Sequence, residues 1–510
     1  MAGDVRGQRV GRAAHDAGAA ARVDGLGRRH GARGVVDGRA RHVRGWRRLC
    51  GGQARRARVG GDAAAGDRRH AGAGHRDRAR HGAHGRVLAH PLPGRRGGGR
   101  PGLRGRRGAA DRGGRGGLHH LGGDQAAARE RRPAGVAAAR AGLPHQGPPG
   151  ALTVRLRFGS PAEAGLDEPA AARLVPAAEA FLDGPAAVHP AYPGFVLLAA
   201  RHGVVVAHEA RGFAVRHGGE AVETRPDTVF DLASLSKLFT AVVVVRLAER
   251  GALDLDEPLS RRLPAFRGEA GPAATARRLL THTAGLPAWL DLGPYPDAEA
   301  RLAAIAGLPR TPGYRYSDLG LVVLGTLAER VAGRGLDQLV AELVTGPLGL
   351  VDTRYNPPAG WRERIAATEF QPWTGRGTVR GSVHDENAYL LGGVAGHAGV
   401  FGTAWDVAVL AQTMLNGGTY GGVRLLGERW VREMLTDHNA GWGEDAARGL
   451  GWQLNQPSFM GELASPTAFG HTGFTGTSVV ADPATGVLLV LLTNRVHPTR
   501  DRGRDGAYRR

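Results

Sequence analysis

The sequence contains a single lysine, and a serine precedes it by three positions. The stretch FDLASLSKLFTAVVVV, residues 230–245, holds Ser234 and Lys237, and the other 67 of the 68 basic residues are arginines. Residues three apart share one face of a helix, so this hydroxyl and this amine can meet. A serine hydroxyl is a weak nucleophile until a base takes its proton, and lysine, unlike arginine, can be that base. The pair predicts nucleophilic catalysis.

The element that must hold this pair is a helix expected over residues 235–250. Its residues are apolar on nearly every face, which is typical of a buried helix, and Gly251 follows at the position that often ends one. The alternative is a capping serine beside a surface lysine. The apolar surroundings oppose it, because a buried lysine needs a partner. Ser234 at the helix N-terminus would also lie at the positive end of the helix dipole.

Two further motifs follow in the chain. Residues 316–318 (Tyr-Ser-Asp) stand at the start of a second expected helix, and residues 471–473 (His-Thr-Gly) stand on an expected strand. Together with Ser-x-x-Lys they resemble the penicillin-recognising serine hydrolases, which are class C β-lactamases, D-alanyl-D-alanine carboxypeptidases and related esterases. The segments LLTHTAGLP, GPLGLVDTRYN, GGVAGHAGVFGTAWDVA and LLTNR extend the resemblance over about residues 155–495.

This resemblance implies a role for each matching residue. Ser234 would be the acylated nucleophile, Lys237 its partner, and Tyr316 a base or proton relay. The backbone N–H groups of Ser234 and Phe474 would form the oxyanion hole. The residues expected to bind the substrate are Asp318, His471, Thr472, Gly473 and Phe474.

The chain departs from the family pattern at two positions. Asp318 stands where the second motif usually has Asn, and a carboxylate there would raise the pKa of Lys237 and keep it cationic. Our hypothesis is that Lys237 then stabilises a Tyr316 phenolate that acts as the base, although the motifs leave open which of the two takes the proton. His471 replaces a lysine with a fixed charge, which favours a carboxypeptidase or an esterase over an efficient β-lactamase.

The pattern of strands and helices predicts an α+β fold. Residues 193–214 read as a β-hairpin with a turn at Arg201-His202-Gly203, and strands on either side of DPATG form a second hairpin near the end. Helices and loops fill about residues 255–455. The resemblance implies a β-lactamase/transpeptidase-like fold, with an antiparallel sheet flanked by helices and an inserted helical lobe. The polar ending HPTRDRGRDGAYRR suggests that the family's last helix is missing or replaced.

The first 150 residues have a different composition from the rest. They hold 33 of the 68 basic residues but only 10 of the 47 acidic ones, and they lack Ser, Thr, Asn, Ile, Phe, Tyr and Lys. Such a segment cannot bury enough apolar surface to offset chain entropy, so residues 1–150 are predicted to be disordered and residues 151–510 to form the hydrolase domain. A basic nucleic-acid-binding tail and a functionless extension compete with the favoured hypothesis, which is that the segment is not genuine protein-coding sequence.

Other residues offer little further chemistry. Cys50 is the only cysteine, so the hydrolase domain has no disulfide and no thiol nucleophile. His384, Asp385 and Glu386 are adjacent, and adjacent residues rarely point at one metal ion. We therefore expect no metal and no cofactor. His282 is interpreted as a helix-end residue, and His397 as a residue that could border the site.

These observations predict a serine hydrolase that works through an acyl-enzyme on Ser234. Its substrates would be D-Ala-D-Ala-type peptides, β-lactams or small esters and amides. The alternative is a non-catalytic sensor or binding protein with the same fold. We expect a monomer with a small-molecule or peptide substrate, no nucleic-acid partner for the folded domain and no membrane partner. With no signal peptide or apolar span in the sequence, a cytoplasmic location is the default, and export is not excluded.

Overall fold

The first predicted hairpin forms one half of a large sheet. In the computed structural model, which describes residues 154–184, 189–268, 274–503 and 506–509, strand β2 (Gly194–Arg201) pairs antiparallel with β3 (Val204–His217). The turn between them is His202-Gly203, where both residues have positive φ, 50° and 80°. The predicted disorder of residues 1–150 concerns a segment outside the described residues, so that prediction and the division at residue 150 stay predictions.

The second predicted hairpin completes the sheet. Its strands run in the order β1-β3-β2-β15-β14-β13-β12, with β4 on β3. Neighbours pair antiparallel as expected, except that β1 pairs parallel with β3, so the sheet is mixed rather than purely antiparallel. The remaining strands of the sheet are β1 (Arg157–Phe158), β4 (Glu220–Glu223), β12 (Gln453–Leu454), β13 (Phe469–Thr472), β14 (Ser478–Asp482) and β15 (Val487–Thr493).

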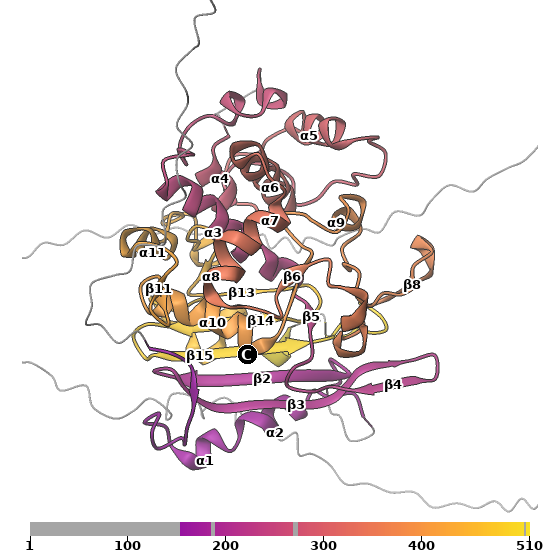
Figure 1. Ribbon diagram of the computed structural model, residues 1–510, viewed down its shortest axis with the longest axis vertical. Helices are drawn as coiled ribbons and strands as arrows, with labels where there is room; N and C mark the ends of the chain where they lie inside the picture. The colour runs from indigo at the N-terminus through magenta and orange to yellow at the C-terminus, as the bar shows by residue number, and fades with distance from the viewer. Residues whose placement is uncertain (1–153, 185–188, 269–273, 504–505, 510) are drawn as a thin grey trace, which may run out of the picture. The chain divides into compact units, whose positions relative to one another are not determined.

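The two faces of this sheet pack against different helices. Alternate side chains of a strand point to opposite faces, and both faces of β2 are apolar. Val196 and Leu198 belong to the main core, whereas Phe195 and Leu197 join a smaller cluster. The smaller cluster includes residues of α2 (Leu174–Glu179). Helices α1 (Glu168–Ala171) and α2 lie on one side of the sheet, and α10 (Ala404–Leu415) and the helical lobe lie on the other side (Figure 1).

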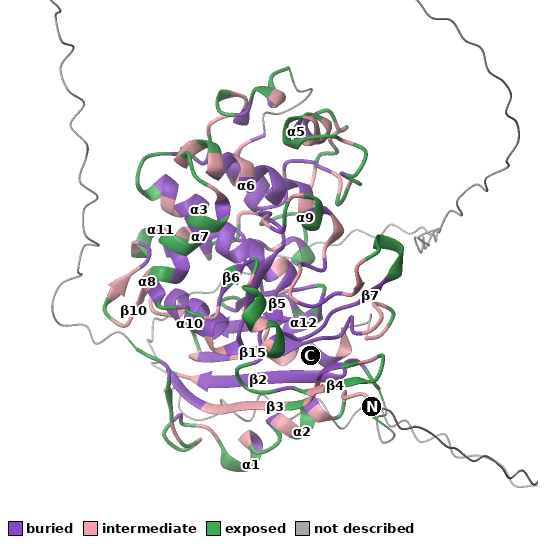
Figure 2. Cartoon of the chain, turned by 45° about the vertical axis from the view of Figure 1, so that its right-hand side comes forward, coloured by how far each residue is buried: buried purple, intermediate pink, exposed green. Residues whose placement is uncertain are grey.

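The helix that carries Lys237 is α3 (Ser236–Glu249), as predicted, and Figure 2 shows it buried. Its β-branched residues favour strands intrinsically, but burial on all sides stabilises the helix. The second predicted helix is α6 (Asp318–Ala332). The other helices are α4 (Ala276–Leu280), α5 (Ala298–Ala306), α7 (Leu336–Val340), α8 (Gly346–Leu348), α9 (Glu386–Leu390), α11 (Glu428–Met434) and α12 (Pro457–Met460). Within the described ranges, none has the length and apolarity needed to cross a bilayer.

Three small sheets among the described residues share no strand with the main sheet. A three-stranded sheet has the order β5-β9-β6, and its central strand β9 pairs with both neighbours. The short strands are β5 (Phe230–Asp231), β6 (Arg354–Tyr355), β7 (Phe370–Gln371), β8 (Gly377–Thr378), β9 (Val400–Gly402), β10 (Thr419–Tyr420) and β11 (Val423–Arg424). Strand β5 leads directly into the turn that holds Ser234.

The chain after β15 contains no long helix in its described part. The described residues there form one 3-10 turn, Ala507–Arg509, and the expectation that the family's last helix is missing or replaced stays a prediction. The ring of Tyr508 packs edge-on against Tyr192 at a centroid distance of 5.3 Å. This contact covers part of the smaller apolar cluster.

Two glycines allow helix α6 to approach the loop that faces α3. A Cβ on Gly396 would lie 2.0 Å from the carbonyl oxygen of Leu321, and one on Gly325 would lie 3.1 Å from the Gly396 nitrogen. The Thr240 hydroxyl donates to the Gly396 carbonyl at 2.9 Å. This close approach of two backbones fixes the loop that continues to His397.

We predict that Gly396→Ala destabilises the domain, because the added methyl group must displace backbone atoms. The free energy of unfolding should fall by about 1–3 kcal/mol, as for other overpacked sites, and thermal unfolding monitored by circular dichroism measures it. The matched control is Gly360→Ala, since a Cβ there meets nothing within 4 Å. Equal stability of the two variants would contradict the proposed close packing.

Candidate functional site

The Ser234 hydroxyl and the Lys237 amine meet as the sequence predicts. Ser234 lies in the 3-10 turn Ala233–Leu235, which runs into α3. Lys237 Nζ donates to Ser234 Oγ at 2.7 Å. The lysine side chain is only 1% exposed, whereas Ser234 is partly exposed, so the amine approaches the hydroxyl from the buried side. A surface lysine beside a capping serine is therefore the wrong interpretation.

Lys237 is also held by a carboxylate. Its Nζ lies 2.7 Å from Asp318 Oδ1 and donates to the carbonyl oxygen of His397 at 3.2 Å. Burial opposes the charge on the amine, but the Asp318 carboxylate and the Tyr316 phenol outweigh it, and the pKa of Lys237 is raised. Burial likewise acts to raise the pKa of Asp318, yet the lysine charge holds it below its ordinary value. The pair is therefore ionised at neutral pH, as expected from Asp318 in the second motif.

Tyr316 lies against this ion pair. Lys237 Nζ is 5.1 Å from the centroid of the Tyr316 ring. The ring of His282 packs on the tyrosine at a centroid distance of 4.5 Å, and His471 lies at 6.2 Å. The N–H of Ser317 donates to His282 Nδ1 at 3.1 Å, which fixes the segment before α6. His282 does follow helix α4, as predicted, but its buried ring also belongs to the site, which the sequence interpretation missed.

His471 is a neutral side chain in this site. It lies near the end of β13, and its Nδ1 contacts the carbonyl oxygen of Thr472 at 2.8 Å. Burial, and next the charge of Lys237, lower the pKa of His471 to about 3. The imidazole therefore carries no charge at neutral pH, which agrees with the expectation that this position has lost a fixed cation.

The turn after β13 packs directly on the segment before Ser234. A Cβ on Gly473 would lie 2.1 Å from Thr477 Oγ1 and 2.6 Å from the carbonyl oxygen of Leu232, so only glycine fits. The next residue, Phe474, has a half-exposed side chain. Among the described residues, the backbone N–H groups of Ser234 and Phe474 have no hydrogen-bond partner. Both donors remain available to a ligand.

The acidic loop around His384 supports the site and shows no metal-ligand geometry. The part of the chain that the structure describes has no cluster of three His, Cys, Asp or Glu side chains that could hold an ion. Asp385 accepts from the Ala388 N–H at the start of α9 and lies 2.9 Å from His397 Nε2. His397 therefore borders the site, through its carbonyl contact with Lys237 and its ring contact with Asp385.

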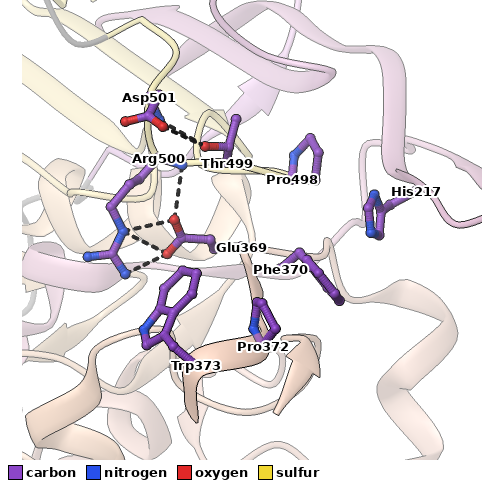
Figure 3. A pocket seen from close by; sticks show the side chains of 9 residues that line it. All are labelled: His217, Glu369, Phe370, Pro372, Trp373, Pro498, Thr499, Arg500 and Asp501. Atoms are coloured by element: carbon purple, nitrogen blue, oxygen red, sulfur yellow. Dashed lines mark hydrogen bonds and ion pairs between the residues drawn. The ribbon is translucent and has the colours of Figure 1, made fainter. Parts of the chain in front are cut away.

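A pocket of about 580 Å³ lies beside this site but does not contain Ser234 (Figure 3). Arg500 forms part of its wall, with its guanidinium carbon 5.5 Å from the Trp373 ring centroid and 5.8 Å from that of Phe474. The lining residues are His217, Glu369, Phe370, Pro372, Trp373, Pro498, Thr499, Arg500 and Asp501. The nucleophilic and charged residues described above are not among them.

Comparisons with known proteins agree with this geometry. The sequence pattern of the β-lactamase family matches residues 170–510. A protein of Escherichia coli (strain K12) named "Putative D-alanyl-D-alanine carboxypeptidase" is 35% identical over 355 residues, covering 60% of this chain and 79% of that protein. A counterpart with the same name in Salmonella enteritidis PT4 (strain P125109) is 33% identical, with 60% and 79% coverage.

Solved structures of similar proteins share the fold of this chain. The hydrolase EstCE1, described as having promiscuous acyltransferase activity, is 27% identical with a TM-score of 0.52, covering 66% of this chain and 97% of that one. A penicillin-binding protein homologue from Caulobacter crescentus is 25% identical with a TM-score of 0.52, covering 64% and 91%. A class C β-lactamase from Rhodobacter sphaeroides, 21% identical with a TM-score of 0.50, covers 62% and 92% and shares the fold.

The fold and the matching family model place the chain in the β-lactamase/transpeptidase-like class, a family of serine hydrolases. The chain belongs to the β-lactamase family. The predicted fold and family are thus confirmed.

The ion pair generates a prediction that the single lysine makes easy to test. Protein labelled with ¹³C at the lysine ε-carbon should give one side-chain signal, and it should remain that of an ammonium above the ordinary lysine pKa of about 10.4. In Asp318→Asn the pKa should fall by about 1–3 units, because the opposite charge is lost. Asp352→Asn, which alters the ion pair with Arg364, is the control and should change nothing. A wild-type signal that titrates below the ordinary value would contradict the assigned charge.

Proposed function

We propose that the chain is an acyl-serine hydrolase that cleaves D-Ala-D-Ala-type peptides, with Ser234 as the nucleophile. The observation that carries the proposal is the contact of Ser234 Oγ with a buried lysine that Asp318 keeps charged. A buried ammonium 2.7 Å from a serine oxygen stabilises negative charge that develops there during attack.

The proton of Ser234 then needs an acceptor other than Lys237. A protonated lysine cannot accept it, and the Tyr316 ring, whose centroid lies 5.1 Å from Lys237 Nζ, carries the candidate acceptor. In this scheme the Tyr316 phenolate takes the proton as Ser234 Oγ bonds to the carbonyl carbon. The same proton goes to the leaving amine when the peptide bond breaks. Water then attacks the acyl-enzyme while Tyr316 takes its proton, and that proton returns to Ser234 Oγ as the acid is released.

The negative oxygen of the tetrahedral intermediate needs fixed donors. The N–H groups of Ser234 and Phe474, which have no partner within the part of the chain that the structure describes, are suited to this role, because the Gly473 turn packs on the segment before Ser234. Preorganised donors of this kind contribute about 10²–10³-fold to the rate. Thr472, at the end of β13, would line the groove beside them.

The substrate class rests on the relatives. The name of the 35%-identical Escherichia coli protein supports a D-alanyl-D-alanine carboxypeptidase. A small-ester hydrolase is the second candidate, because His471 is neutral and EstCE1 aligns over 97% of its length. The neutral His471 argues against an efficient β-lactamase. A binding protein that is never acylated is the non-catalytic alternative.

We predict that intact-mass labelling with a fluorescent penicillin and a fluorophosphonate gives one adduct per chain. The adduct should vanish in Ser234→Ala, and hydrolysis of a D-Ala-D-Ala peptide should fall by at least about a thousandfold. Ser458→Ala, a change at an exposed serine, is the control. No adduct with either probe would favour the binding protein, and faster turnover of a p-nitrophenyl ester than of the peptide would favour the esterase.

Tyr316→Phe should lower kcat by about 10²–10⁴-fold, because the variant lacks the proposed base. The comparison variant is Tyr314→Phe, which removes a hydroxyl from a neighbouring tyrosine whose ring centroid lies 6.5 Å from that of His282. Steady-state hydrolysis of the same substrate measures both. If Tyr316→Phe keeps the wild-type kcat, Tyr316 is not the base.

A further inference from the structure

Asp231 is a buried carboxylate outside the three motifs, and it lies three residues before Ser234. It is 2% exposed, and within the described part of the chain it forms no ion pair with an arginine or lysine. Burial raises its pKa, while hydrogen bonds from the backbone of His384 and Ala233 act in the opposite direction. Burying such a group is costly unless its oxygens are hydrogen-bonded, so its partners indicate what it does.

One carboxylate oxygen holds the turn that carries Ser234. Asp231 Oδ1 accepts from the N–H of Ala233 at 2.9 Å, which is an Asx-turn contact two residues along the chain. Ala233 has a φ of +47°, in the left-handed region that a residue with a Cβ adopts only at a cost of about 1–2 kcal/mol. The peptide that follows Ala233 carries the Ser234 N–H. The carboxylate therefore stabilises the backbone conformation that aims this donor.

The second carboxylate oxygen holds the acidic loop. Asp231 Oδ2 accepts from the His384 N–H at 2.6 Å, and His384 Nε2 lies 3.0 Å from Glu369 Oε2. Arg500 Nε donates to Glu369 at 2.8 Å (Figure 3), and the same guanidinium lies over the Phe474 ring. Hydrogen bonds thus link Asp231 through His384 and Glu369 to Arg500, and a cation–π contact links Arg500 to the side chain of Phe474, the second candidate donor residue.

The backbone of Asp231 reaches the same residue by a shorter path. The Thr475 hydroxyl donates to the Asp231 carbonyl oxygen at 2.7 Å, and Thr475 directly follows Phe474. Next to it, the Thr477 hydroxyl donates to the carbonyl oxygen of Leu232 at 2.9 Å. Asp231 therefore contacts a neighbour of each candidate oxyanion donor, Ala233 before Ser234 and Thr475 after Phe474.

We propose that Asp231 is a positioning residue that sets the spacing and orientation of the Ser234 and Phe474 N–H groups. This inference rests on the proposed function, since it assigns a role within the same acyl-transfer site. Asp231 does not touch the substrate. It acts through Ala233, His384 and Thr475, and its loss should affect transition-state binding more than substrate binding.

The test compares Asp231→Asn with the wild-type protein. An amide keeps the shape but has one acceptor oxygen, so one of the two N–H partners must face an NH₂ group. We expect kcat to fall by about 10–100-fold with KM changed by less than about threefold, as for a small misplacement of catalytic groups. The affinity for phenylboronic acid, whose boron bonds to the serine oxygen in a tetrahedral adduct, should fall by the same factor as kcat/KM.

The matched control is Asp406→Asn. Asp406 is also buried, at 5% exposure, and its Oδ2 accepts from the Thr353 hydroxyl at 2.8 Å and the Asp352 N–H at 3.1 Å, away from the site. It should lower the thermal midpoint without changing kcat or boronic acid affinity. If Asp231→Asn behaves like this control, Asp231 is only structural and the proposal is overturned.

A second variant covers the case in which Asp231→Asn does not fold. Thr475→Val keeps the shape of the side chain but removes the hydroxyl that contacts Asp231, and kcat and boronic acid affinity should fall together. Unchanged values for both would overturn the proposal. Activity that persists in Ser234→Ala would instead refute the proposed function itself, so the two failures are distinguishable.

Discussion

The buried ion pair between Lys237 and Asp318 is the interaction on which the rest of the site depends. A lysine that is 1% exposed would be strongly destabilising without a charge partner, because water no longer solvates its ammonium. Asp318, whose carboxylate pairs with the ammonium, is the first residue of α6, and Lys237 lies in the first turn of α3. The two helices must therefore pack with these ends together. That packing places Tyr316, two residues before Asp318, against the same ammonium.

The loop between α9 and β9 adapts to this arrangement. It passes so close to α6 that Gly396 has no room for a side chain, and its next residue turns the His397 carbonyl toward Lys237. The ammonium is thus surrounded by a carboxylate, a carbonyl oxygen and the serine hydroxyl. Arginine could carry the same charge, but its planar guanidinium does not fit a compact site with these three acceptors. This geometry explains why a chain with 67 arginines keeps one lysine here.

Much of this arrangement was predictable from the sequence. The two hairpins, α3 and α6 follow local periodicity and turn residues, and the contacts of Lys237 with Ser234 and Asp318 follow from motif residues at helix starts. The parallel pairing of β1 was not visible, because two residues carry no pattern of direction. The contact of the His282 ring with Tyr316 was not predictable, since a position after a short helix does not indicate which ring it meets.

Asp231 shows why other parts of the site could not be predicted. Its role depends on Ala233, His384 and Thr475, which lie up to 244 positions away in the sequence and meet only in the folded chain. The positive φ of Ala233 is also invisible in a residue that usually avoids it. One signal was present, since an acidic residue in the mostly apolar stretch FDLASLSKLF must find partners when the segment is buried.

The central claim is that Lys237 stays charged while Ser234 loses its proton to another group. The most direct test measures the acylation rate and the titration of the single lysine side chain in the same wild-type protein as the pH rises. The account predicts that acylation reaches its maximum at a pH where the lysine signal is still fully that of an ammonium. An acylation rate that instead rises in step with deprotonation of Lys237 would contradict it and would make the lysine the base.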